Sequence, residues 1–303
     1  MQRRQLLRIS LRLTLRRCCW KLPHRVCLLA GAGSRRRRGR ELLPRGPGTT
    51  LRVTPFQVHA SGTPNGTPIV LLHGFLSDHR MWRTVCAAHP EWCSLGLDLP
   101  GHGDAARARC TGSQLTATLA QWIATLDALP VLVGYSMGGR VLRQLLVNHP
   151  VAHRGALLIG THAGYSPAEG LRRQKADDQL AHDLEQYGVV PFVERWEQLP
   201  VFAGQPPSDG QRALRLDQNA EGLAASLRSF GSGTCSAGGE RKSTGPIQLI
   251  FGDRLGADAV HAKRLARDWP DAQRVPIEGV GHNPVLECPE RVGELIASAA
   301  AGA

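Results

Sequence analysis

The sequence predicts one α/β domain in which a mostly parallel sheet is covered by helices on both faces. From about residue 50 onward, short apolar runs alternate with longer segments whose apolar residues have helical spacing, and this alternation is typical of a parallel sheet. The residues Gly-Tyr-Ser-Met-Gly at 134–138 stand between one such run and one such helix. A chain of 303 residues is long enough to bury the core of one such domain.

An arginine-rich head precedes this domain. Residues 1–48 contain thirteen Arg and one Lys against the single acid Glu41, so the rest of the chain has a net charge of −1 although the whole has +12. The folded part therefore has no basic surface of the kind that binds nucleic acid. The apolar runs of the head are too short and too charged for an integral membrane segment. We expect a disordered extension or an overlong translated start, with an organellar transit peptide as the alternative.

The eight cysteines are scattered, and the chain has neither a CxxC pair nor an HExxH motif. This spacing is not that of a linear zinc motif, so we expect no metal. A disulfide framework is not expected in a chain of this size either, which favours a reducing compartment. We therefore expect a cytoplasmic protein, unless the head directs it to an organelle.

The domain opens with an edge hairpin. Residues 51–53 and 56–59 are predicted to form its two strands, because turn residues follow them. Residues 68–72 are apolar throughout and predict a buried strand. A helix is predicted at 78–88, and the next strand at 95–98.

A tight turn rich in Gly and Pro follows this strand and contains Asp98 and His102. We expect these two side chains to brace the turn rather than to take part in catalysis. The next helix is predicted at 114–126, with Ser113 as its cap.

The serine at 136 lies where a strand meets a helix. Residues 130–133 predict the strand, and residues 141–147 predict the helix. Side chains at Gly134 and Gly138 would collide with neighbouring backbone in so sharp a turn. The turn lifts the Ser136 hydroxyl above the sheet, and the positive end of the helix favours anionic character there.

After a further strand at 155–160, the alternation stops. Between residues 166 and 228 the chain holds charged helical segments with no strand between them. We interpret them as a helical cap, at about 165–230, that lies over the serine. Residues 231–245 are rich in Gly and Ser and predict a flexible return to the sheet.

The last part of the chain completes the sheet. Residues 247–251 and 273–277 are predicted as strands. Between them lies a helix at 259–269, for which Asp258 is a suitable cap. A closing helix begins at Pro289.

The chain also offers partners for the serine. His282 follows the last predicted strand, late in the chain, as the order serine, acid, histidine requires. It would activate Ser136 as a base. The backbone N–H groups of Phe75, just after the strand at 68–72, and of Met137 would form an oxyanion hole.

These motifs together resemble the α/β-hydrolase fold over residues 50 to 300. The resemblance implies a mostly parallel eight-stranded sheet in a domain at 49–303. Its motifs are Gly134-Tyr135-Ser136-Met137-Gly138, His73-Gly74-Phe75, Asp98-Leu99-Pro100-Gly101-His102-Gly103 and Gly281-His282-Asn283-Pro284.

Finer features are similar to the menaquinone-pathway family of 2-succinyl-6-hydroxy-2,4-cyclohexadiene-1-carboxylate synthases. They are Arg140, the cap run from Trp196 to Ala203, and Arg215 ahead of Glu221. The resemblance implies a cofactor-free lyase that eliminates pyruvate from 2-succinyl-5-enolpyruvyl-6-hydroxy-3-cyclohexene-1-carboxylate. It also implies that this small polycarboxylate is bound by Tyr135, Trp196, Arg140 and Arg215, with the two arginines as bidentate forks.

The acid of the triad departs from this family. The family places it three residues after the glycine that ends the seventh strand, where this chain has Leu255. We expect Asp253 to replace it, because side chains two residues apart on an extended segment face the same way. Asp258 is an alternative, and so is the absence of an acid. The family's arginine in the first cap helix falls on Leu171.

Two other functions fit the same residues. The chain could be a serine carboxylesterase or thioesterase, in which Ser136 attacks an acyl group. Without a triad acid, it could also be a catalytically silent binding protein.

Overall fold

A computed structural model describes residues 50–204, 206–254 and 256–302. The predictions for the head at 1–48 and for position 255 lie outside these residues.

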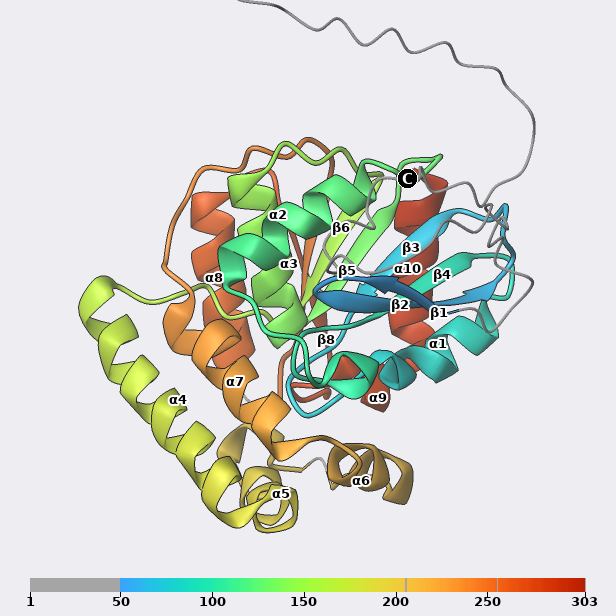
Figure 1. The fold of residues 1–303 in the computed structure, drawn as a ribbon. Coiled ribbons are helices and arrows are strands. Elements are labelled where there is room, and N and C mark those ends of the chain that lie inside the picture. The colour runs from blue at the N-terminus through green and yellow to red at the C-terminus, as the bar shows by residue number, and fades with distance from the viewer. Residues whose placement is uncertain (1–49, 205, 255, 303) are drawn as a thin grey trace, which may run out of the picture.

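Eight strands of the described chain form a single sheet in the order β1-β2-β4-β3-β5-β6-β7-β8 (Figure 1). The pairs β1–β2 and β2–β4 are antiparallel, and all other neighbouring pairs are parallel. The predicted mostly parallel eight-stranded sheet is thus confirmed. The strands are β1 Thr50–Val53, β2 Phe56–Gly62, β3 Pro68–Leu72, β4 Cys93–Asp98, β5 Val131–Tyr135, β6 Gly155–Ile159, β7 Ile247–Gly252 and β8 Gln273–Ile277.

Helices cover both faces of this sheet and enclose two apolar cores (Figure 1). Successive side chains of a strand point to opposite faces, so in β3 Val70 joins one core and Leu71 the other. The first core contains α2 Gly112–Ile123, α3 Met137–Asn148 and α8 Ala257–Asp268; the second contains α1 Arg83–Ala88 and α10 Pro289–Ala301.

Two predicted helix caps are wrong. The side chain that caps α2 belongs to Thr111, which accepts from the backbone N–H of Gln114, and not to Ser113. Helix α8 begins at Ala257, so Asp258 lies inside its first turn instead of capping it. The carboxylate of Asp258 therefore does not cap the helix and can accept a hydrogen bond from another group.

Four helices stand between β6 and β7 and lie beyond one end of the sheet (Figure 1). Three of them, α4, α5 and α7, share a third apolar cluster that contains Phe192, Leu223 and Leu227 and reaches Leu76 in the loop after β3. This contact places the helices next to the loop after β3. The four helices are α4 Pro167–Tyr187, α5 Val189–Glu197, α6 Asp209–Leu216 and α7 Ala220–Phe230.

The remaining elements are short. A 3-10 turn, η1, spans His79–Trp82 before α1, and α9 spans Pro284–Glu287 before α10. Among the described helices, none has the length and apolar character needed to cross a membrane.

Candidate active site

Ser136 occupies the sharp turn between β5 and α3. Its backbone angles are φ 49° and ψ −105°, a strained region for a residue with a side chain. The flanking glycines are required by space: a Cβ on Gly134 would lie 2.6 Å from the carbonyl oxygen of Gly138, and one on Gly138 would lie 2.4 Å from that of Leu72. The serine therefore stands directly after the carboxyl end of β5, an inner strand of the sheet.

His282 lies between Ser136 and an acid. Its Nε2 is 3.1 Å from Ser136 Oγ, and its Nδ1 is 2.8 Å from Asp258 Oδ2. A carboxylate only accepts, so Nδ1 carries the proton and Nε2 is left to accept from the serine hydroxyl. The side chains of His282 and Asp258 are each 12% exposed, so the contact is largely shielded from water. This is the geometry of a serine, histidine and acid triad.

The prediction that Asp253 would be this acid is wrong. The Asp253 Oδ1 atom accepts from the backbone N–H of Gly279 at 2.8 Å and so links the end of β7 to the loop after β8. The chain enters α8 only a few residues later. The first turn of that helix, instead of an extended segment, presents the acid to His282.

The loop after β3 lies against the serine turn. The backbone N–H of Gly138 donates to the carbonyl oxygen of His73 at 3.0 Å. The His73 ring is buried, donates from Nδ1 to the carbonyl oxygen of Gly74 and accepts at Nε2 from the backbone N–H of Leu99. Burial lowers the pKa of His73, so it fixes the loop as a neutral ring and does not act as the base.

The predicted oxyanion donors are both close to this junction. Phe75 is in the loop after β3, and Met137 is the first residue of α3. Within the described residues, neither backbone N–H has a hydrogen-bond acceptor. Both groups are therefore available to a ligand.

A pocket of about 450 Å³ opens over Ser136. All four side chains predicted to bind substrate line it: Tyr135, Arg140, Trp196 and Arg215. The rings of Phe75 and Trp196 are 5.2 Å apart and form part of an apolar wall. The site thus combines an apolar wall with positive charge beside the serine.

The two predicted arginines differ in their surroundings. Arg140 donates from Nη2 to the backbone carbonyl of Phe230 at 2.9 Å, whereas its Nε is buried without a partner. No carboxylate pairs with Arg140 among the described residues, and burial lowers its pKa. Arg215 instead donates to Glu197 at 2.8 Å and lies over the Phe202 ring.

A third arginine of the pocket was not predicted. Arg173 of α4 lines the pocket, with its Nη2 2.9 Å from Asp177 Oδ1. Leu171, where the family resemblance placed an arginine, is 62% exposed. The helical spacing of the sequence could have predicted an inward-facing Arg173, because residues 170, 173 and 177 lie on the same face of α4.

Two histidines that the sequence analysis did not single out complete one side of the pocket. The rings of His162 and His261 lie 3.8 Å apart, and His162 accepts at Nδ1 from the backbone N–H of Gly164. Burial, together with the nearby His261 and Arg140, lowers the pKa of His162 to about 3. His162 is therefore neutral at ordinary pH and presents an Nε2–H donor.

Comparison with known sequences identifies relatives over most of the chain. Residues 69–295 match the alpha/beta hydrolase family. A 2-succinyl-6-hydroxy-2,4-cyclohexadiene-1-carboxylate synthase from Enterobacter sp. (strain 638) is 32% identical over 247 residues, which cover 78% of this chain and 93% of the relative. The synthase of the same name from Klebsiella pneumoniae (strain 342) is 31% identical, over 74% of this chain and 90% of the relative.

Solved structures share the fold. MenH from S. aureus superposes with a TM-score of 0.69 and 25% identity, over 81% of this chain and 97% of that one. A thermophilic esterase from Thermogutta terrifontis superposes with a TM-score of 0.64 and 22% identity, over 82% of this chain and 97% of that one. The fold of this chain is thus shared by a protein named MenH and by a protein named an esterase.

Proposed function

The chain belongs to the alpha/beta hydrolase family, and we propose that within it the protein is a cofactor-independent lyase of menaquinone biosynthesis. The reaction eliminates pyruvate from 2-succinyl-5-enolpyruvyl-6-hydroxy-3-cyclohexene-1-carboxylate and gives 2-succinyl-6-hydroxy-2,4-cyclohexadiene-1-carboxylate. The relatives that carry the name of this synthase support the assignment.

The part-buried Arg140 carries this proposal. Its guanidinium lines the serine pocket with no carboxylate partner among the described residues, and its Nε is buried without a hydrogen-bond acceptor. A charge that is partly withdrawn from water without a counter-ion is unfavourable. A carboxylate of the substrate would supply the missing partner and accept from the guanidinium. Arg173 and Arg215 line the same pocket, so it suits a ligand with several carboxylates better than a neutral ester.

The triad supplies the base. Ser136 donates its proton toward His282 Nε2, and the serine oxygen removes the proton beside the succinyl carbonyl. The electrons of that C–H bond enter the carbonyl as an enolate, which the N–H groups of Phe75 and Met137 stabilise. As the enolate collapses, the C–O bond to the enolpyruvyl group breaks. The leaving group takes up a proton and becomes pyruvate.

The same residues could hydrolyse an ester or thioester. A serine within hydrogen-bond reach of a histidine and an acid is also the arrangement of an acyl nucleophile. The silent-binding alternative depended on a missing acid, and the contact between Asp258 and His282 removes that reason for it.

Two assays on the purified full chain separate the lyase from the hydrolase. We expect the wild type to release pyruvate from the enolpyruvyl substrate and the Ser136→Ala variant to release none. Mass spectrometry should detect no acylated serine at any time during the reaction. A burst of product from an activated ester, with an acyl group trapped on Ser136 and no pyruvate formed, would contradict the lyase assignment and favour the hydrolase.

A further inference from the structure

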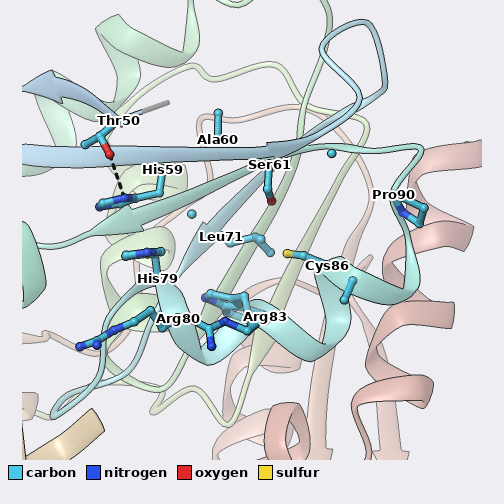
Figure 2. A pocket seen from close by; sticks show the side chains of 14 residues that line it. Thr50, His59, Ala60, Ser61, Leu71, His79, Arg80, Arg83, Cys86 and Pro90 are labelled. Carbon is cyan, nitrogen blue, oxygen red and sulfur yellow. Dashed lines mark hydrogen bonds between the residues drawn. The ribbon is translucent and has the colours of Figure 1, made fainter. Parts of the chain in front are cut away.

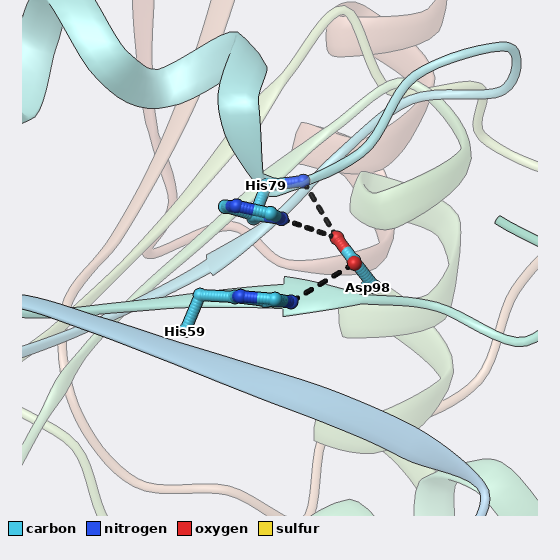
Figure 3. Close-up of side chains that lie close together, drawn as sticks. All are labelled: His59, His79 and Asp98. Carbon is cyan, nitrogen blue, oxygen red and sulfur yellow. Dashed lines mark hydrogen bonds and ion pairs between the residues drawn. The ribbon is translucent and has the colours of Figure 1, made fainter. Parts of the chain in front are cut away.

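A second group of chemically active side chains lies outside the serine pocket. His59 of β2 and His79 of η1 both point at the carboxylate of Asp98, where β4 ends (Figure 3). His59 Nε2 is 3.0 Å from Asp98 Oδ2, and His79 Nδ1 is 2.8 Å from Asp98 Oδ1. The two rings are stacked with centroids 3.5 Å apart.

We propose that His59, His79 and Asp98 form a binding site for a divalent transition-metal ion such as Zn²⁺. One ligand atom from each residue lies within 4.8 Å of the other two. Ligands on one ion, with bonds of about 2.0–2.2 Å, lie at most about 4.4 Å apart, so only a small closure is needed. Two imidazoles and a carboxylate suit Zn²⁺, Co²⁺ or Ni²⁺ better than Mg²⁺ or Ca²⁺.

A fourth ligand is at hand. Asp104 Oδ2 is 3.6 Å from His59 Nε2, and its side chain is 67% exposed, so it can rotate toward an ion. The two carboxylates also give the site the negative charge that a divalent cation requires. The positive charge of the neighbouring Arg80 is already paired with Asp78 and Asp217.

Outer contacts hold the ligands in orientations that suit a metal. Thr50 Oγ1 is 3.3 Å from His59 Nδ1 (Figure 2), so it can accept the Nδ1 proton and leave the Nε2 lone pair for the ion. The backbone N–H groups of His79 and Asp104 donate to the two oxygens of Asp98 at 2.8 Å. Such second contacts fix the tautomer and orientation of metal ligands.

The cluster is open to small solutes. Its two histidines line a pocket of about 520 Å³ between β2 and the η1–α1 segment (Figure 2). Their side chains are 15% and 28% exposed, whereas Asp98 is fully buried. When the ion enters, each imidazole keeps its proton on the ring nitrogen that faces away from the ion, and the stacked rings splay so that their lone pairs converge.

The site is separate from the proposed chemistry. None of its ligands lines the pocket over Ser136. They come from three segments far apart in the sequence, so no linear motif marks them. We expect the ion to stabilise the end of β4 and the turn after it.

The test titrates the full chain with Zn²⁺ and follows binding by calorimetry. The wild type should take up one more equivalent of Zn²⁺ than His59→Gln or His79→Gln, and only the wild type should gain thermal stability from that equivalent. Thr50→Val, which keeps all the ligands, should weaken the same binding step by about 10–100-fold. The matched control is His89→Gln, because His89 is also part-buried beside a carboxylate, that of Glu91.

Zn²⁺ held by other histidines or cysteines is common to all these proteins and cancels in the comparison. Equal stoichiometry in the wild type and in either folded histidine variant would overturn the proposal. So would an undiminished affinity in Thr50→Val, which keeps the assay decisive if the histidine variants do not fold.

Discussion

The guanidinium groups that line the serine pocket are neutralised to different degrees. Arg215 shares Glu197 with Arg212, and Arg173 is paired with Asp177, whereas Arg140 has no carboxylate partner among the described residues. A substrate carboxylate therefore gains most at Arg140, where it neutralises a part-buried charge that has no other carboxylate partner. At Arg173 it must share the cation with Asp177.

Arg173→Gln should raise KM about tenfold or more while it changes kcat little, because the charge binds the ground state and the transition state alike. Steady-state kinetics of pyruvate release measures both constants. Arg172→Gln is the matched control, since Arg172 is an exposed neighbour on the same helix. Equal effects of the two substitutions on KM would show that Arg173 does not bind the substrate.

The triad acid shows where residue-level prediction from the sequence fails. Ser136 could be predicted because it follows a strand whose apolar run is plain in the sequence, and His282 because it lies late in the chain after the last predicted strand. The acid could not, because the choice between Asp253 and Asp258 depends on where α8 begins. An extended segment would have favoured Asp253, but the helix starts at Ala257.

At the scale of elements, the cap helices are tied to the sheet by a buried polar link. Gln218, between α6 and α7, donates from Nε2 to Asp78 at 2.9 Å, and its Oε1 accepts from the backbone N–H of Gly103 at 3.1 Å. Asp78 and Gly103 belong to the loops after β3 and β4. One side chain thus joins three segments beside the serine pocket.

Gln218→Leu should lower the free energy of unfolding by about 1–3 kcal/mol, because it leaves buried polar groups without a partner. It should also speed amide hydrogen exchange in α6 and the first turn of α7. Gln198→Leu is the control, as Gln198 is exposed on the cap. Unchanged exchange in Gln218→Leu would show that this polar link does not hold α6 and α7 in place.

Most elements could be predicted from apolar periodicity, but their ends could not. Both Ser113 and Thr111 carry a hydroxyl that can cap a helix, and the backbone of Thr111, at φ −82° and ψ 163°, decides between them. The four residues of α9 are too few to give a helical period.

At the scale of the whole molecule, buried histidines link stability to pH. Burial lowers the pKa of His102 to about 3 and that of His153 to about 4, as it does at His162. Between about pH 4 and pH 6.5, these rings are largely neutral in the folded protein. In the unfolded chain the same rings are protonated over this range. The unfolded state then binds more protons, so stability rises with pH across this window.

We therefore expect the free energy of unfolding to be fully retained above pH 6.5 and to fall progressively from there toward pH 4. Urea unfolding at several pH values measures this slope. His153→Leu removes one of the titrating rings and should make the slope shallower, whereas His182→Leu, at an exposed site on α4, should not. A slope unchanged by His153→Leu would contradict the linkage.

The most direct test of the proposed lyase site is the turnover number for pyruvate release in Asp258→Asn and Asp253→Asn. An asparagine at 258 can no longer stabilise the charged ring of His282, so kcat should fall on the order of 10⁴-fold. An asparagine at 253 can still accept from Gly279, so kcat should stay close to the wild-type value. A near-normal kcat in Asp258→Asn, or an equal loss in both variants, would contradict the account.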